Sequence, residues 1–543
     1  MRILIGSLIV TASVLLPPAL LIAIGQSDPA IQELLVPTKA SVPLRVVVTR
    51  PRGGPDARPA VLFYTTYDAP FATNAGKRAA ERGFVGVVVY ARGLRTDMRE
   101  WVPYENDGRD LYDVIDWISK QSWNNGAVGM YGGSYTGFAQ WAATKRLHPA
   151  LKTIVPQVAV MPGYDTPMEN NVCATFLCLN WPNDTAQNPP LPQDLFTRWY
   201  AQGSSYRSLD RLAGRPNAHF QTFLRHPAYD DYWRSMTPTA AEFAALQIPV
   251  LTTTGYYDGA QIGALRYMAL HHQYNPQAEQ YLVIGPYDHR GAQRMPPATV
   301  MGYDIDPAAR VDLEALAYDW LDYVLRHGKK PALLKDRVNY EVMGVNEWRH
   351  APSLEAAATG TFTMHLTDFT ETVDFADRRT QNNLFTQQII IGSLDGLNAS
   401  VSVSEPFAEE TTIAGRFSGQ LTATVNKKDM DVSIGFYELM PDGRYFFLTR
   451  YLGRASYARD KSRRQLLRPG VKETIPIGDV RMVSRRFVKG SRLAVAVQVN
   501  KNPFEVINYG SGKDVYDETI GDAGEPLVVK WSKDSFVSVP IVQ

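Results

Sequence analysis

The chain has 543 residues, of which 56 are Lys or Arg and 55 are Asp or Glu, so its formal charge is +1. This balance argues against a dedicated nucleic-acid binder, which would carry a marked basic excess. The content of 45% hydrophobic and 20% charged residues is that of a globular rather than a disordered chain. With two cysteines in all, Cys173 and Cys178, a disulfide-stapled scaffold and a Cys-rich zinc site are excluded. A single bridge between them and two free thiols are both open.

The first 25 residues are predicted to be a signal peptide or an N-terminal anchor. Residues 3–24 are apolar apart from small or hydroxyl side chains, and Arg2 is the single charge in the segment. A small-x-small site at 23–25 precedes Gln26, which is typical of a secretory signal. A run of about 20 apolar residues is also long enough to span a bilayer uncleaved. We therefore expect an exported protein, periplasmic or secreted, with membrane anchoring through residues 3–24 as the alternative to cleavage.

The next part of the chain predicts a largely parallel sheet, because strand and helix patterns alternate. The strand candidates lie at 59–64, 86–90 and 126–131, and the helix candidates at 74–82, 111–118 and 135–147. From about 163 to 245 the sequence becomes rich in Asn, Pro, Asp and aromatic residues, with helical pieces and no clear strand. We interpret this segment as a helical cap inserted over the sheet.

The alternation of strand and helix patterns then resumes, and short strand patterns without helices replace it towards the C-terminus. Strands are predicted at 249–254 and 281–284, with a helix near 261–274 between them. An amphipathic helix at 313–325 is followed by Lys329-Lys330-Pro331, which ends it. Beyond it, short strand patterns separated by turns predict an all-β sandwich, for example at 421–425, 432–439 and 492–499.

A glycine-rich segment, residues 132–137 (Gly-Gly-Ser-Tyr-Thr-Gly), follows a predicted strand and opens a predicted helix. A nucleophile elbow needs this context: its serine, here Ser134, sits on a sharp turn at a helix N-terminus, where developing negative charge is favoured. Thr136 stands where the strict Gly-x-Ser-x-Gly pattern has its second glycine. A tight turn with a capping serine is therefore an alternative interpretation.

Two further residues fit the same chemistry. Asp258 follows the strand at 249–254, and His289 follows the strand at 281–284. Catalytic groups of open α/β sheets gather at the carboxyl ends of the strands, and the order Ser, Asp, His is that of α/β-hydrolases. Asp288 is a rival acid, but adjacent side chains on an extended segment point apart. The remaining histidines lack this placement and no metal-ligand spacing occurs, so we expect neither a metal site nor a cofactor.

These residues resemble the X-Pro dipeptidyl peptidase and cocaine-esterase-like family of α/β-hydrolases, which includes α-amino acid ester hydrolases and glutaryl-cephalosporin acylases. That family's elbow is Gly-x-Ser-Tyr-x-Gly, which residues 132–137 satisfy, Thr136 included. Two positions depart from it, because the family usually has Asp at Tyr90 and Trp at Tyr287. The resemblance covers about residues 37–543 and rests on residues 67–68, 92–94, 129–137, 255–258, 285–289 and 340–349.

The resemblance implies a fold, and with it the boundaries of the domains. We expect an α/β fold class, with an α/β-hydrolase domain at 37–330 that carries the cap insertion at about 163–245. A C-terminal jelly-roll sandwich is expected at 335–543, and residues 340–349 resemble its start in that family. The signal peptide or anchor at 1–25 precedes both domains.

The resemblance also implies the catalytic roles. Ser134 would be the nucleophile, His289 the general base and then acid, and Asp258 the carboxylate that orients it. The oxyanion hole would consist of the Tyr135 backbone N–H and the Tyr67 hydroxyl, a donor that adds no charge.

The substrate is less well defined by the sequence. Asp165 and Glu169 lie just past a predicted strand at 151–155, near the expected pocket mouth. They would hold a substrate ammonium, as the resemblance to aminopeptidases and amino-ester hydrolases allows. The alternative is that both are solvated loop carboxylates. We expect an exported serine hydrolase of ester or amide bonds in small molecules or short peptides, with an esterase ahead of the alternatives. These are an Xaa-Pro dipeptidyl peptidase, an α-amino acid ester hydrolase, and a non-catalytic binding protein on a hydrolase scaffold. The acyl group, the leaving group and the oligomeric state, a homo-oligomer included, stay open.

Overall fold

The computed structural model describes residues 31–53, 56–382, 384 and 386–542. The predicted signal peptide or anchor at 1–25 lies outside these residues. Within them, no helix is both long enough and apolar enough to cross a membrane.

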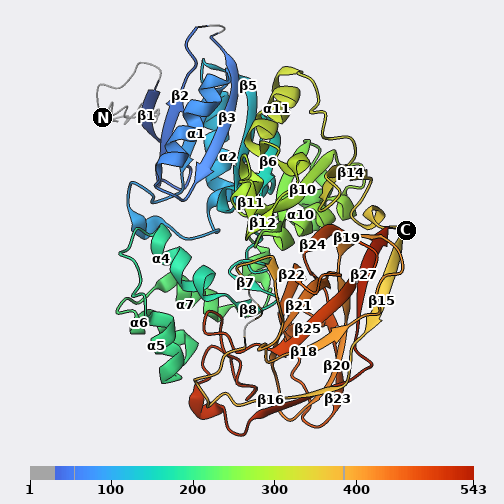
Figure 1. Ribbon diagram of the computed structural model, residues 1–543. Helices are drawn as coiled ribbons and strands as arrows, with labels where there is room; N and C mark the ends of the chain where they lie inside the picture. Colours follow the sequence, from blue (N-terminus) through green and yellow to red (C-terminus); the bar gives the residue numbers. More distant parts are fainter. Residues whose placement is uncertain (1–30, 54–55, 383, 385, 543) are drawn as a thin grey trace, which may run out of the picture.

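A mixed sheet of ten strands forms the core of the described chain (Figure 1). The seven central strands, β4, β3, β5, β6, β9, β10 and β13 in order across the sheet, are parallel to one another. Antiparallel strands occupy both edges, β1 and β2 at one and β14 at the other. Helices cover both faces, which is why the central strands read as unbroken apolar runs such as β4. In spatial order the strands are β1 (Ile31–Val36), β2 (Leu44–Thr49), β4 (Val85–Tyr90), β3 (Arg58–Thr65), β5 (Asn124–Gly133), β6 (Leu151–Gln157), β9 (Val250–Tyr257), β10 (Gln280–Asp288), β13 (Val338–Val342) and β14 (Glu347–Ala351).

The helices that pack on this sheet follow the predicted pattern closely. The helix α10 spans the predicted residues, whereas α2 begins four residues before its apolar pattern. That first turn holds Asp107 and Asp110, because carboxylates are favoured at a helix N-terminus. The helices are α1 (Pro70–Glu81), α2 (Asp107–Ser119), α3 (Tyr135–Thr144), α10 (Gln261–Tyr274) and α11 (Leu313–Arg326). A small hairpin, β11 (Thr299–Val300) and β12 (Tyr303–Asp304), follows β10.

The segment between β6 and β9 is mostly helical and lies below the core beside the C-terminal domain in the view of Figure 1. Its helices are α4 (Trp181–Thr185), α5 (Leu195–Gln202), α6 (Leu209–Leu212), α7 (Ala218–Arg225), α8 (Asp231–Arg234) and α9 (Ala240–Ala245). It also contains a two-stranded ladder, β7 (Met168–Glu169) and β8 (Val172–Cys173), which the sequence did not predict because two-residue strands show no alternation. Cys173 and Cys178 form a disulfide with a Cα–Cα distance of 6.3 Å.

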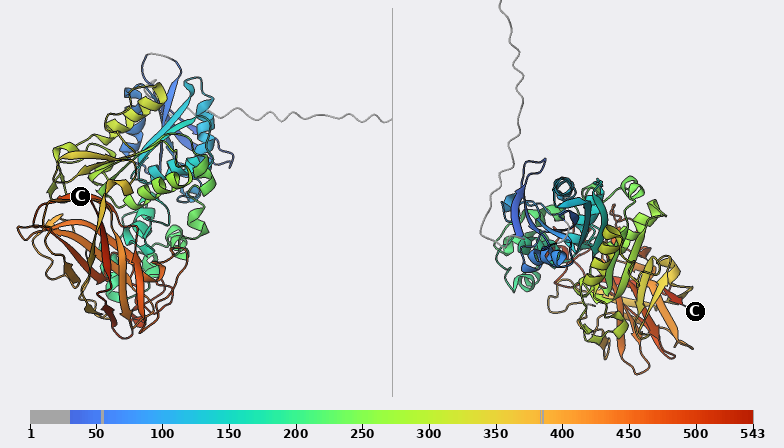
Figure 2. Two further views of the ribbon diagram at one scale, coloured as in Figure 1. Left: turned by 90° about the vertical axis from the view of Figure 1, so that its right-hand side faces the viewer. Right: turned by 90° about the horizontal axis from the view of Figure 1, so that it is seen from above.

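The C-terminal domain is an antiparallel sandwich packed at one end of the core, as Figure 2 shows from two further directions. The hairpin of β13 and β14 extends the core sheet, so the sandwich's own strands start with β15. One sheet contains β15 (Gly360–His365), β16 (Phe369–Val373), β19 (Thr411–Arg416), β20 (Ser418–Val425), β23 (Lys472–Ile477), β24 (Met482–Phe487), β26 (Leu527–Trp531) and β27 (Phe536–Val542). The other contains β17 (Ile390–Ile391), β18 (Ser400–Val403), β21 (Asp431–Leu439), β22 (Tyr445–Arg454) and β25 (Arg492–Val499). The predicted fold class, an α/β core followed by an all-β sandwich, is confirmed.

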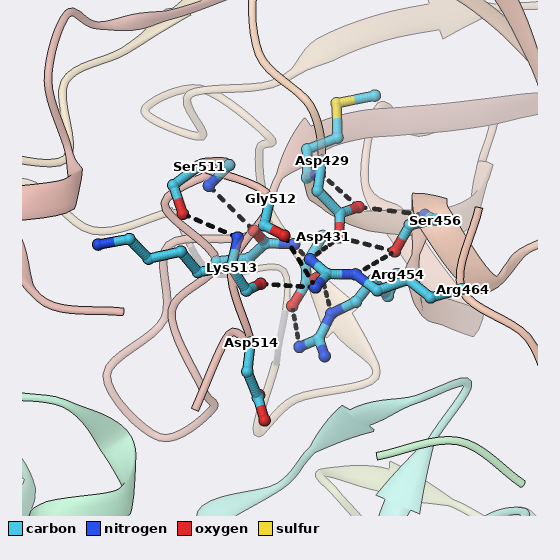
Figure 3. A network of polar contacts seen from close by, with 12 residues as sticks. Asp429, Asp431, Arg454, Ser456, Arg464, Ser511, Gly512, Lys513 and Asp514 are labelled. Atoms are coloured by element: carbon cyan, nitrogen blue, oxygen red, sulfur yellow. Dashed lines mark hydrogen bonds and ion pairs between the residues drawn. The ribbon is translucent and has the colours of Figure 1, made fainter. Parts of the chain in front are cut away.

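A buried polar network fixes the long loop that follows β25 onto the sandwich (Figure 3). The guanidinium of Arg454 makes two hydrogen bonds to Asp431, at 2.8 and 3.0 Å. Arg464 donates to Asp429 at 2.8 Å and to the carbonyl of Lys513 at 2.5 Å. Because the buried charges are paired and hydrogen-bonded, the loop is held without an uncompensated ion.

Candidate active site

Ser134 occupies the turn between β5 and α3, and its backbone is in the left-handed region with φ of 63°. A non-glycine residue is disfavoured there, and this strain is a property of the nucleophile elbow. The flanking glycines are required by close packing. A Cβ on Gly132 would lie 2.5 Å from Thr136 Cγ2, and one on Gly137 would lie 2.7 Å from the carbonyl oxygen of Gln157. The glycine spacing of the segment is therefore explained by the turn itself.

Asp258 and His289, from loops at the ends of β9 and β10, meet in the structure. His289 Nδ1 lies 2.7 Å from Asp258 Oδ1. The carboxylate is fully buried and also accepts hydrogen bonds from Ala260 N at 2.9 Å and from Thr254 Oγ1 at 2.7 Å. Asp288 instead accepts from backbone N–H groups of its own turn. The Asp258 contact leaves Nε2 as the nitrogen of His289 that is free to exchange a proton.

The electrostatics of this pair suit an imidazolium held beside a carboxylate. Burial alone would raise the pKa of Asp258, but the charge and hydrogen bond of His289 outweigh it and the pKa is lowered. Burial would lower the pKa of His289, but Asp258 outweighs burial and the pKa is raised. Each group therefore stabilises the charged form of the other.

A chain of hydrogen bonds connects the elbow to the histidine loop. Ser134 N donates to the Gln157 carbonyl at 3.1 Å, and Gln157 Nε2 donates to the Gln293 carbonyl at 3.4 Å. Gln293 Nε2 in turn donates to the His289 carbonyl at 2.6 Å. Among the described residues no hydrogen bond joins the Ser134 hydroxyl to His289; in unliganded sites such bonds are often long and tighten in the complex.

The structure brings Tyr67 to the elbow as well. Burial raises the pKa of Tyr67, and the neighbouring Trp181 and Ser134 side chains partly offset this effect. Trp181 Nε1 donates to Tyr67 Oη at 3.3 Å. Because this bond uses a lone pair of the phenol, the Tyr67 O–H stays available as a donor towards the elbow. The sequence did not point to Trp181, since its position in the cap carries no motif.

Tyr135 begins α3, so its backbone N–H has no acceptor within the helix. Its buried side chain donates to Asp107 Oδ2 at 2.8 Å, and its hydroxyl accepts from Tyr104 N at 2.9 Å. Asp107 also accepts from Tyr64 Oη at 2.5 Å. Burial raises the pKa of Asp107 to about 7. This network holds the residue whose N–H points out of the helix start, and sequence reasoning missed it.

Asp165 and Glu169 have partners within the chain. Asp165 accepts from Met161 N at 2.8 Å and from Gly263 N at 2.7 Å, and burial raises its pKa to about 7. Glu169 binds the guanidinium of Arg481 through both oxygens, at 3.1 and 2.6 Å. The alternative of solvated loop carboxylates is wrong, because both side chains are buried. The predicted role in holding a substrate ammonium stays a prediction.

The site has the kinds of group that acyl transfer through a serine requires. It combines a strained serine at a helix start, a histidine oriented by a buried carboxylate, and a phenol and a backbone N–H as donors near the serine. Within the described part of the chain, no cluster of three or more His, Cys, Asp or Glu residues could hold a metal ion.

Comparisons with known proteins show the family of the chain. The family model of the X-Pro dipeptidyl-peptidase (S15 family) matches residues 41–291, and that of the X-Pro dipeptidyl-peptidase C-terminal non-catalytic domain matches residues 334–522. The chain is 24% identical over 535 residues to cocaine esterase from Rhodococcus sp. (strain MB1 Bresler), covering 87% of this chain and 90% of that protein.

Two solved structures share the fold over nearly the whole chain. An α-amino acid ester hydrolase has a TM-score of 0.81 at 20% identity, covering 98% of this chain and 100% of that one. An aminopeptidase from the marine sediment archaeon Thaumarchaeota archaeon has a TM-score of 0.80 at 18% identity, covering 96% and 98%.

Proposed function

The chain belongs to the X-Pro dipeptidyl-peptidase and cocaine-esterase-like family and is a serine hydrolase, and on that premise we propose that it cleaves ester or amide bonds through an acyl-enzyme on Ser134. The observation that carries the proposal is the 2.7 Å contact of His289 Nδ1 with buried Asp258, in a chain whose elbow holds Ser134 at φ of 63°. We further propose that residues 1–25 direct export.

The chemistry follows from the positions of these groups. His289 Nε2 removes the proton of the Ser134 hydroxyl as Oγ attacks the carbonyl carbon, and Asp258 stabilises the imidazolium that results. The oxyanion is bound by the Tyr135 N–H and the Tyr67 hydroxyl. His289 then protonates the leaving group, and a water molecule hydrolyses the acyl-enzyme by the same steps.

Ester substrates are favoured over peptides with a free amino terminus. An ammonium needs an available carboxylate in a partly buried site, and the two predicted candidates, Asp165 and Glu169, are bonded to Met161, Gly263 and Arg481. A neutral acyl group needs no such partner. The substrate class we propose is therefore small-molecule esters.

Covalent labelling tests the proposal. The purified protein should react with a fluorophosphonate and hydrolyse members of a panel of p-nitrophenyl esters, amino-acid esters and Xaa-Pro p-nitroanilides, with the esters fastest. Ser134→Ala should abolish labelling and turnover and keep the melting temperature, while Ser204→Ala in a cap loop should behave as wild type. Wild-type hydrolysis by Ser134→Ala would exclude Ser134 as nucleophile. Ligand binding without turnover by the wild-type protein would favour the non-catalytic alternative.

A further inference from the structure

The C-terminal sandwich places one arginine against the loop that carries Asp258. Arg481, immediately before β24, is 7% exposed. Its Nε donates to the carbonyl oxygen of Asp258 at 3.1 Å, and its Nη2 donates to that of Gly259 at 3.2 Å. A side chain from the C-terminal domain therefore binds the backbone of Asp258, the carboxylate proposed to orient His289.

The other side of the same guanidinium is held by the cap. Glu169, on β7, accepts from Nη1 at 3.1 Å and from Nη2 at 2.6 Å and is 8% exposed. A bidentate pair of this kind fixes the plane of the guanidinium as well as its position. Arg481 thus joins the cap, the core and the sandwich at one point.

A second clamp from the same stretch holds the far end of the loop. Gln261, the first residue of α10, donates from Nε2 to the carbonyls of Gly255 at 2.8 Å and of Met482 at 3.0 Å. Met482 N donates back to Gln261 Oε1 at 2.5 Å. The segment from 255 to 261, which runs from the end of β9 to the start of α10, is therefore bound by two consecutive residues of the C-terminal domain.

We propose that Arg481, oriented by Glu169, is a positioning residue for the reaction at Ser134. Arg481 sets the position of Asp258 and, through Asp258, the orientation of His289. This inference rests on the proposed function. The physical reason is that the Asp258 carboxylate must meet Nδ1 at hydrogen-bond distance, and a misplacement of about 1 Å in a catalytic group costs about 10²-fold in rate. The C-terminal domain then takes part in catalysis without touching the reacting atoms.

A purely structural ion pair is the competing explanation, and the sandwich offers a matched control. The pair of Arg454 with Asp431, drawn in Figure 3, is also buried and bidentate. Among the described residues, no hydrogen bond or ion pair joins either of these side chains to the segment from 255 to 261. Removing one partner of a buried pair leaves an unpaired charge that destabilises the fold. Both members are therefore replaced together, as Arg481→Met/Glu169→Gln and as Arg454→Met/Asp431→Asn.

The test compares the two double variants with wild type and with Arg481→Lys, which keeps a donor for the Asp258 carbonyl. On an ester that the wild-type enzyme hydrolyses, Arg481→Met/Glu169→Gln should lose about 10²-fold in kcat with KM little changed, and Arg481→Lys should recover part of the loss. The control pair should keep wild-type kcat whatever its melting temperature. Wild-type kcat in Arg481→Met/Glu169→Gln, or an equal loss in the control pair, would overturn the proposal.

A readout independent of turnover separates this inference from the proposed function. The Nδ1 proton of His289, bonded to Asp258, should give a low-field proton resonance at a pH where the imidazole is charged. We expect that resonance to move or broaden in Arg481→Met/Glu169→Gln and to stay in the control pair. If the resonance changes in this way but the wild-type protein has no hydrolase activity, the proposed function is refuted and the positioning of His289 by Arg481 is kept. If the resonance is unchanged in Arg481→Met/Glu169→Gln, the positioning role is refuted.

Discussion

Replacing Tyr67 by Phe removes one hydroxyl and keeps the ring. The ring packs against Phe71 with centroids 5.9 Å apart, so this contact survives the change. The hydroxyl is the acceptor of Trp181 Nε1, and burial raises its pKa, so at neutral pH it is a protonated donor. Tyr67→Phe therefore deletes the proposed oxyanion donor and disturbs little else.

The size of the effect follows from when the bond forms. A donor used mainly in the transition state typically contributes about 10²–10³ in kcat, or roughly 3–4 kcal/mol. The loss of the Trp181 partner acts on the ground state of the folded protein instead and is expected to cost about 1–3 kcal/mol of stability at most. We thus expect kcat and kcat/KM to fall together by about 10²-fold or more, with KM little changed.

Steady-state kinetics on one ester, together with a melting curve, checks this. Trp181→Phe is the matched comparison, because it removes the indole donor and leaves the Tyr67 hydroxyl; its loss in kcat should be smaller. A Tyr67→Phe enzyme with wild-type kcat would refute the oxyanion assignment. A raised KM with unchanged kcat would instead assign Tyr67 to substrate binding, and activity that falls only as the melting temperature falls would assign it to structure.

Two further predictions concern the N-terminus and a buried acid. A protein that starts at Gln26 should be soluble and as active as the full chain, because the segment before it has no polar face and the described fold begins with β1. Folding is judged by circular dichroism. If the shorter chain fails to fold while the full chain folds, the export proposal is refuted. Burial raises the pKa of Asp107 to about 7, whereas the unfolded chain releases this proton above about pH 4. Because the folded protein binds one proton more than the unfolded chain between these values, the free energy of unfolding decreases as pH rises from about 4 to 7. Asp107→Asn should therefore gain stability relative to wild type as pH rises through that window, and a melting-temperature difference that is flat with pH would contradict the raised pKa.

Much of the fold could be predicted from the sequence, because local patterns report local structure. Buried parallel strands must be apolar along their whole length, as in β4, and α10 and β25 span the predicted residues. The glycines around Ser134 are visible in the sequence because a sharp turn excludes side chains. Asp258 and His289 could be named because the carboxyl ends of parallel strands gather at one edge.

The tertiary structure alone decided how these groups are supported. Glu169 and Arg481 are 312 residues apart in the chain, and no local pattern reports that they meet. The burial of Asp165 and the contact of Trp181 with Tyr67 likewise depend on how the cap folds back onto the core. The periodicity of a sequence shows which face of its own element a side chain occupies, but packing between elements decides which partner it meets. Only the three-dimensional arrangement therefore shows which charges are compensated and which hydroxyl is free to donate.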